Sequence, residues 1–183
     1  YAKRFYAPCL ISCDDPERKK PVLNISNERM TAFEGIVRWK LRNNKAEILQ
    51  SGEKSVNVPA LTAQNVLDID LSQELVSRTD PREKYLEYSI MENAFVRPKE
   101  LTFLEPAITY GIAESEDKFA LTFCAENYAK SVCLSLKTAD CVFSDNWFDI
   151  HGKEPVTIMI DKASLSRKMT AQELSEELEI MHN

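Results

Sequence analysis

Hydrophobic and polar residues alternate with a period of two along much of this chain. Such alternation places one side chain in a core and the next in water, so it predicts half-buried β-strands of about five to seven residues. The clearest stretches are 37–41, 67–71, 84–90, 119–124, 131–136 and 156–160. Turn-forming pairs and triplets lie between the stretches, at Asp14-Asp15-Pro16, Asn43-Asn44, Ser51-Gly52, Asp80-Pro81 and His151-Gly152.

Helical signals are few. Residues 71–75 predict a single helical turn that Pro81 stops. Near the C-terminus, Thr170-Ala171-Gln172-Glu173 has the capping-box pattern, in which the Thr hydroxyl and the Glu carboxylate satisfy each other's backbone N–H groups. A short helix over about 171–178 is therefore expected. Many short strands with so little helix predict an all-β fold of the sandwich type.

The strand series pauses once, which indicates a domain boundary. Residues 84–90 read as the last strand of a first domain, 92–94 and 97–99 break the pattern, and 107–112 begin a new series. We place the seam near residue 98, which gives two consecutive immunoglobulin-like sandwiches, 1–98 and 99–183, each near the usual size of about 100 residues.

Trp39 is the more informative of the two tryptophans. It alternates in phase with Val37 and Leu41, so we expect it to be buried between the two sheets of the first sandwich. The alternative is an exposed platform on which a sugar ring would stack.

Composition narrows the function classes. The 183 residues are 44% hydrophobic and 28% charged, with a net charge of -6 and a pI near 5.1. Nucleic-acid binding requires a basic face, and the one basic run, Arg18-Lys19-Lys20, is flanked by acids. No apolar run reaches the roughly 18 residues of a membrane helix. Neither nucleic acid nor membrane is therefore an expected partner.

The cysteines form no metal-binding pattern. Cys9, Cys13, Cys124, Cys133 and Cys141 contain no CxxC pair, and His151 and His182 lie at no ligand-like spacing from them. We expect no metal or cofactor, and free thiols in a reducing compartment, the cytoplasm; a Cys124–Cys133 bridge across a hairpin is the alternative. The chain starts without Met and without a signal peptide, so we expect it to be a fragment or a processed product.

The pattern of acidic residues gives little support for a catalytic pair of carboxylates. Asp145 and Asp149 flank Trp147, which could resemble a sugar site, but Ser144-Asp145-Asn146 is turn-forming, and the turn is the favoured interpretation. The remaining candidates are interpreted as surface groups: Glu114, Glu116 and Asp117 in a hairpin loop, Glu173, Glu176, Glu177 and Glu179 on a helix face, and both histidines. Asn24-Ile25-Ser26 matches a glycosylation acceptor but lies within a strand pattern. We predict no catalytic residue in this chain.

Several segments resemble a known family. Tyr1-Ala2-Lys3-Arg4-Phe5-Tyr6-Ala7-Pro8 is similar to the segment that leaves the catalytic barrel in the β-mannosidase branch of glycoside hydrolase family 2. Segments 22–27 and 37–41 resemble two strands of the immunoglobulin-like domain that follows, and 98–101 with 106–108 resemble the entry to the last domain. Phe143-Ser144-Asp145-Asn146-Trp147-Phe148-Asp149-Ile150, followed by His151-Gly152, resembles the segment of that last domain in which Phe-Ser-Asp-Asn, an aromatic residue and Phe-Asp follow one another.

The resemblance implies that these are the C-terminal accessory domains of a retaining β-mannosidase whose catalytic glutamates lie on a TIM barrel. The barrel would then be the main partner, with a contact between copies as a further one. One alternative is a carbohydrate-binding module, for which Trp147, Phe148 and Tyr110 are the candidate aromatic residues. Another is a secreted, adhesin-like sandwich pair, which would favour paired cysteines.

Overall fold

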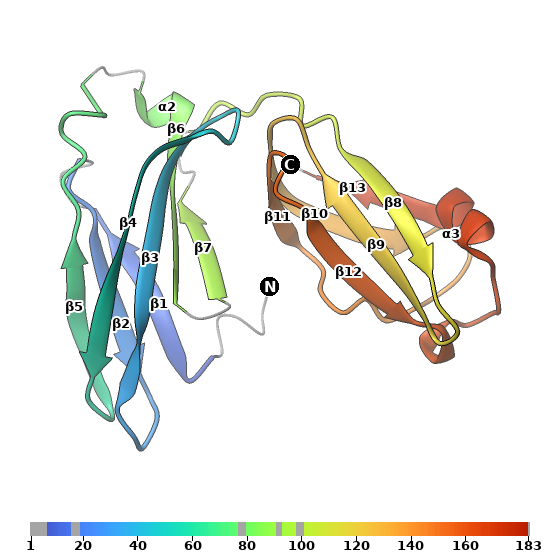
Figure 1. The fold of residues 1–183 in the computed structure, drawn as a ribbon, viewed down its shortest axis with the longest axis horizontal. Coiled ribbons are helices and arrows are strands. Elements are labelled where there is room, and N and C mark those ends of the chain that lie inside the picture. Colours follow the sequence, from blue (N-terminus) through green and yellow to red (C-terminus); the bar gives the residue numbers. More distant parts are fainter. Residues whose placement is uncertain (1–6, 16–18, 77–79, 91–92, 98–100, 183) are drawn as a thin grey trace. The chain divides into compact units, whose positions relative to one another are not determined.

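The chain folds into two β-sandwich units, as the computed structural model shows (Figure 1). The structure describes residues 7–15, 19–76, 80–90, 93–97 and 101–182. The chain divides into two compact units between Thr102 and Phe103. The predicted seam near residue 98 lies outside the described residues. The prediction of an all-β fold with a short C-terminal helix is confirmed.

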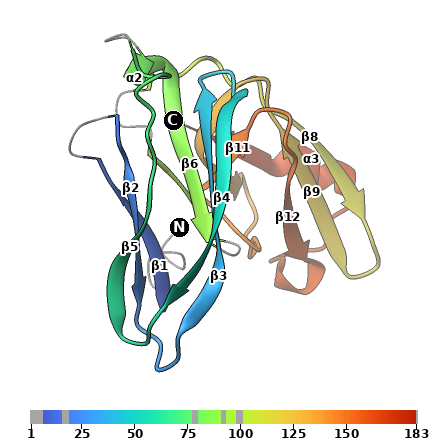
Figure 2. The same cartoon turned by 60° about the vertical axis from the view of Figure 1, so that its left-hand side comes forward.

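The first unit packs a three-stranded sheet on a four-stranded sheet, and all neighbouring strands are antiparallel. Figure 2 shows β1, β2 and β5 in one layer and β3, β4 and β6 in the other. The strand order is β1-β2-β5 in one sheet and β4-β3-β6-β7 in the other. The bounds are β1 Cys9–Asp14, β2 Val22–Asn27, β3 Phe33–Asn43, β4 Ile48–Val58, β5 Thr62–Asp68, β6 Lys84–Ile90 and β7 Asn93–Arg97.

The second unit packs two three-stranded sheets, β11-β10-β13 and β12-β9-β8. Its core contains Phe119, Leu121 and Phe123, which alternate along β9 with partly or fully exposed residues, as predicted. The bounds are β8 Thr109–Glu114, β9 Lys118–Cys124, β10 Tyr128–Leu136, β11 Phe148–His151, β12 Val156–Asp161 and β13 Leu178–Met181. A 3-10 turn, η1 (Lys162–Ser164), follows β12, and helix α3 (Ala171–Glu177) precedes β13.

The Ser51-Gly52 turn predicted in the first unit is wrong, because both residues lie inside β4. Gly52 is the cross-strand partner of Trp39, and the indole lies against its backbone. Trp39 packs against the core cluster on the same face as Val37 and Leu41, but it is only partly buried. The expected inward orientation is therefore confirmed, whereas full burial between the sheets is not.

The stretch 67–71 was predicted as one strand, but β5 ends at Asp68. Ile69 and Leu71 are still buried, and their N–H groups donate to the carbonyls of Pro21 (3.0 Å) and Lys19 (2.9 Å) instead of continuing the regular ladder. A helical turn does follow, with Leu75 N donating to Leu71 O at 2.9 Å. Pro81 does not stop this turn; it lies within a separate short helix, α2 (Asp80–Glu83), where the first turn tolerates proline.

The end of the first unit also differs from the prediction. Segment 84–90 is not the last strand, because β7 follows and pairs with it residue by residue as an antiparallel hairpin. Residues 92–94 were interpreted as a break, but Asn93 and Ala94 lie in β7, opposite Ile90 and Ser89. The strand predicted at 107–112 is β8, which starts two residues later, at Thr109; Ala107 has a left-handed φ of 46°, outside the strand region.

Candidate functional site

The segment 143–149 carries the candidate acids of the second unit, and its side chains bond to their own backbone surroundings. Asp145 Oδ1 accepts the N–H of Asn146 at 2.8 Å. The side chain of Asn146 makes two hydrogen bonds to the backbone of Leu134 on β10. Its Oδ1 accepts the Leu134 N–H at 2.8 Å, and its Nδ2 donates to the Leu134 carbonyl at 2.9 Å. Asp145 and Asn146 thus bond backbone groups, as the turn interpretation expects, but the segment is a bend that Asn146 joins to β10 and not a hydrogen-bonded turn.

Asp149 serves a second structural purpose on β11. Its Oδ1 accepts the N–H of Ser131 at 2.8 Å, and its Oδ2 accepts the hydroxyl of Tyr128 at 3.1 Å. Ser131 lies at the register shift of β10 and has a φ of 53°, in the left-handed region. The carboxylate of Asp149 thus holds an irregular stretch of strand, and both of its oxygens are occupied.

The three aromatic residues proposed for a sugar-binding row do not form one. Phe148 is 2% exposed and belongs to the core, whereas Trp147 is 50% exposed. Tyr110 lies on β8, where its hydroxyl is 3.0 Å from Ser175 Oγ and its ring packs against Phe123. A flat row of exposed rings is therefore absent at these three positions.

Trp147 has an unusual backbone. Its φ is 63°, a left-handed value that is rare for a large aromatic residue, and its N–H donates to Asn146 Oδ1 at 3.0 Å. This hydrogen bond to the Asn146 side chain supports the left-handed backbone of Trp147.

His151 lies in an aromatic stack and not beside a nucleophile. Its ring stacks on Tyr128 at 5.3 Å between centroids, and Tyr128 stacks on Phe103 at 5.9 Å. Tyr128, the middle ring, is 1% exposed, whereas His151 is partly buried and Phe103 is 38% exposed, so the stack reaches the surface at Phe103. His182 lies after β13 and is exposed, in agreement with its interpretation as a surface residue.

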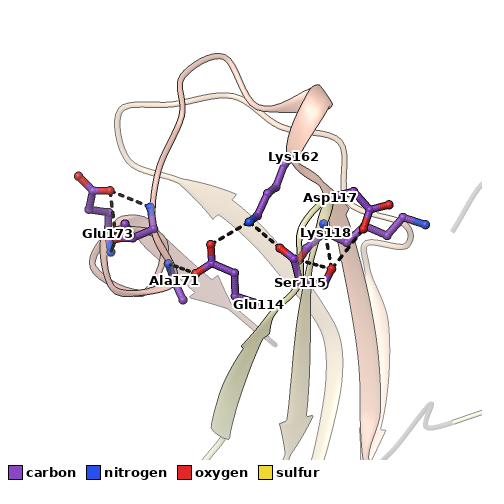
Figure 3. Close-up of polar contacts among 8 residues, drawn as sticks. Glu114, Ser115, Asp117, Lys118, Lys162, Ala171 and Glu173 are labelled. Atoms are coloured by element: carbon purple, nitrogen blue, oxygen red, sulfur yellow. Dashed lines mark hydrogen bonds and ion pairs between the residues drawn. The ribbon is translucent and has the colours of Figure 1, made fainter.

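A cavity of about 420 Å³ lies beside η1 in the second unit. It is lined by Glu116, Lys162, Ala163, Leu165, Lys168 and Met169. Lys162 Nζ already donates to Glu114 Oε1 at 2.8 Å and to the Ser115 carbonyl at 2.6 Å, and it lies 4.8 Å from the centroid of the Phe119 ring. Through these hydrogen bonds the ammonium group of Lys162 binds the hairpin that joins β8 and β9, as Figure 3 shows.

Glu114 connects that hairpin to helix α3. Its second oxygen, Oε2, accepts the N–H of Ala171 at 3.1 Å (Figure 3). The hydrogen bond from Lys162 and then that from the Ala171 amide lower the pKa of Glu114 below its usual range. Glu114 was predicted to be a surface charge in a loop. Its side chain is 40% exposed, as expected, but it is the last residue of β8 and bonds to two other elements.

The candidate acids of the second unit are engaged in hydrogen bonds within it. Retaining glycoside hydrolysis needs an acid and a nucleophile about 5–5.5 Å apart across a sugar, whereas Asp145, Asp149 and Glu114 each satisfy backbone or lysine groups. Among the described residues, no group of three or more His, Cys, Asp or Glu side chains could hold a metal ion. Within the same part of the chain, no helix is long and apolar enough to cross a membrane.

All five cysteines are described, and all are free thiols. Cys124 lies on β9 and Cys133 on β10, which belong to different sheets, so the alternative bridge across a hairpin does not form. Burial, with Asp140 as the second cause, raises the pKa of Cys141 to about 11. Burial also raises the pKa of Cys9.

Sequence reasoning missed two residues that organise the first unit. Asn27 is 2% exposed, and its amide donates to the carbonyls of Thr31, Val58 and Pro59 at 3.0–3.1 Å. Arg42 is 1% exposed and pairs with Glu87 at 2.7 Å. Arg42 is in phase with the polar residues Arg38 and Lys40 of β3, so alternation predicts that it faces water. Asn27 is in phase with the buried Leu23 and Ile25 of β2, so its inward position could have been read from the alternation, although its hydrogen-bond partners could not.

Two family models match the chain. Residues 20–107 match the mannosidase Ig/CBM-like domain, and residues 103–183 match the Ig-fold domain of mannosidases. No curated protein matches the chain significantly in sequence.

Solved structures share the fold along almost the whole chain. The β-D-mannosidase from Dictyoglomus thermophilum superposes with a TM-score of 0.72 at 16% identity, covering 98% of this chain and 22% of that one. The exo-chitosanase from Amycolatopsis orientalis gives a TM-score of 0.56 at 12% identity, covering 99% of this chain and 26% of that one. At these identities the likeness concerns the fold, and the chain spans about a quarter of the length of those proteins.

Proposed function

The chain belongs to two domain families of mannosidases, the Ig/CBM-like domain over 20–107 and the Ig-fold domain over 103–183, and from this we propose that it is the non-catalytic C-terminal part of a longer β-mannosidase. The longer enzyme would be a retaining, exo-acting member of glycoside hydrolase family 2. Its acid/base and nucleophile glutamates would lie on a catalytic barrel.

One observation carries this proposal: a match along 98% of this chain takes up 22% of a β-D-mannosidase. The candidate acids support the non-catalytic part of the proposal. Asp145 accepts the N–H of Asn146 and Asp149 holds the irregular stretch of β10, so neither offers a free carboxylate facing the other across a sugar-sized gap. In this proposal the two sandwiches act as a scaffold that packs on the barrel, with a contact between copies as a further role.

Free thiols at all five cysteines support a reducing compartment, and we propose a cytoplasmic location on that basis. They also speak against the secreted, adhesin-like pair. The carbohydrate-binding alternative has a single exposed aromatic residue, Trp147, in the segment that was its best candidate.

The test compares the 183-residue chain with the longer protein that contains it. The chain alone should release no p-nitrophenol from p-nitrophenyl β-mannoside above the buffer blank, whereas the longer protein should release it. Asp145→Asn and Asp149→Asn in the longer protein should leave kcat within about threefold, because neither carboxylate touches the reacting atoms in this proposal. Turnover by the chain alone that either substitution abolishes would overturn it.

A further inference from the structure

Helix α3 is short and has little core contact of its own. It spans seven residues, of which only Leu174 is buried. Helices shorter than about 12 residues are marginal in water without tertiary support. The contacts that dock α3 on the second unit therefore decide whether it stays folded.

Two carboxylates hold its first turn. Glu114 of β8 accepts the N–H of Ala171, one of the amides at the start of the helix that lack a partner within it. Glu173 closes the capping box: its Oε2 accepts the Thr170 N–H at 2.7 Å, while Thr170 Oγ1 accepts the Glu173 N–H at 3.3 Å. Figure 3 shows both carboxylates beside the first turn of the helix.

A third carboxylate holds the last turn. Glu177 Oε1 accepts the hydroxyl of Thr138 at 2.7 Å and Oε2 accepts its N–H at 2.8 Å, which ties α3 to the loop after β10. Arg167 Nη2 lies 2.9 Å from the same carboxylate. Glu177 was predicted to be one of four solvated acids on a helix face, but its side chain is only 14% exposed.

Other contacts of α3 do not depend on a carboxylate. Lys137 Nζ donates to the Glu176 carbonyl at 2.6 Å, and the Lys137 N–H donates to the Glu177 carbonyl at 3.0 Å. Tyr110 on β8 bonds to Ser175. The next strand, β13, pairs with β10 through backbone bonds and would retain the chain if α3 left.

We propose that α3 is an acid-released latch: protonation of Glu114, Glu177 and Glu173 detaches the helix from β8 and from the loop after β10 and opens its capping box, while both sheets of the second unit stay folded. Release would uncover Leu174, which is fully buried in the core of the unit, and would break the contact between Tyr110 of β8 and Ser175. The elements that contact or flank the helix carry further charged residues: Glu116, Asp117 and Lys118 on the hairpin, Asp161 and Lys162 at η1, Arg167 and Lys168 before the helix, Lys137 after β10, and Glu176 and Glu179 on or after the helix.

The pKa shifts have the sign that this latch requires. The Thr170 N–H and then its hydroxyl lower the pKa of Glu173, and the Thr138 hydroxyl, the Thr138 N–H and Arg167 lower the pKa of Glu177. The pKa of Glu114 is lowered as well. A carboxyl group whose pKa is lower in the folded state than in the unfolded state stabilises the folded state. This stabilisation is fully present at a pH above the unfolded-state pKa, about 4.3 for Glu, and is lost as the pH falls through the folded-state pKa. Release is therefore expected below about pH 4.

Amide hydrogen exchange of the 183-residue chain, corrected for intrinsic rates, tests the proposal. Between pH 7 and pH 3, α3 should lose its protection while β9 in the core keeps it. Loss of protection in α3 and β9 together would overturn the latch, since α3 would then leave only when the unit unfolds. Full protection of α3 at pH 3 would overturn it too.

Substitutions separate charge from packing. Glu114→Gln with Glu177→Gln should speed exchange in α3 already at pH 7 and flatten its pH dependence, since an amide cannot carry the charge. Glu116→Gln is the matched control: it lies on the same hairpin, and its carboxylate makes no hydrogen bond to another described residue. An unchanged pH profile in the double variant, or the same change in the control, would contradict the assignment of the latch to these carboxylates.

Discussion

The indole of Trp39 lies so close to Gly52 that a Cβ added to the glycine would come within 2.7 Å of Nε1. The two residues are cross-strand partners on β3 and β4. The ring occupies the space that a side chain at position 52 would need. Glycine is therefore required here by the packing of Trp39 and not by a turn.

Gly52→Ala should destabilise the first unit by about 1–3 kcal/mol, because the ring or the strand must shift to admit the methyl group. Trp39→Ala should cost about 2 kcal/mol, less than the 3–5 kcal/mol typical of a fully buried Trp, since Trp39 is only partly buried. Urea unfolding of the single and double variants checks both values.

The double variant tests directly whether the strain caused by Gly52→Ala comes from the Trp39 ring. With the indole gone, Gly52→Ala should cost less than half of what it costs in the native chain, because its clash is with that ring. Additive losses would show that the strain at Gly52 comes from elsewhere.

Asn27→Ala should destabilise the first unit by about 2–4 kcal/mol. The substitution leaves the buried carbonyl of Val58 without its donor and also removes the bonds to Thr31 and Pro59. Asn24→Ala, on the same strand, removes one longer bond of 3.3 Å to Val22 and should cost under about 1 kcal/mol. Equal losses in the two variants, measured by chemical denaturation, would contradict the central role of Asn27.

Thiol titration should find five reactive cysteines in the denatured, non-reduced chain, since all five are free. In the native chain at pH 8, Cys141 should react slowly: its pKa of about 11 leaves little of the reactive thiolate. Raising the pH toward 10 should speed its reaction. Three titratable thiols in the denatured chain would instead indicate one disulfide.

Manno-oligosaccharides should leave the melting temperature of the chain unchanged at millimolar concentration. A ligand that binds only the native state at 100 times its Kd would add about 2.7 kcal/mol of stability. Trp147→Phe is the control for fluorescence, because it removes the exposed indole and leaves Trp39. A rise in melting temperature that Trp147→Ala abolishes would favour the carbohydrate-binding alternative over the scaffold.

Short-range patterns were enough to predict much of this fold. Alternation along 119–124 and 156–160 predicted β9 and β12, because burial of one sheet face acts on every second side chain. The capping box at Thr170 predicted the start of α3, because its bonds join residues three positions apart. The turn interpretation of Asp145 rested on the same kind of local bond.

Contacts between distant segments decided the rest. Whether Gly52 belongs to a turn or a strand depends on Trp39 across the sheet, and whether Glu177 is solvated depends on Thr138. Asn27 is buried because β4 ends at Val58 beside it, 31 positions away in sequence. The sequence alone determined that strands form along 119–124 and 156–160 and where the C-terminal helix begins, since these follow from neighbouring side chains. Only the tertiary structure decided which polar groups are buried and bonded, since their partners meet only after the sheets have packed.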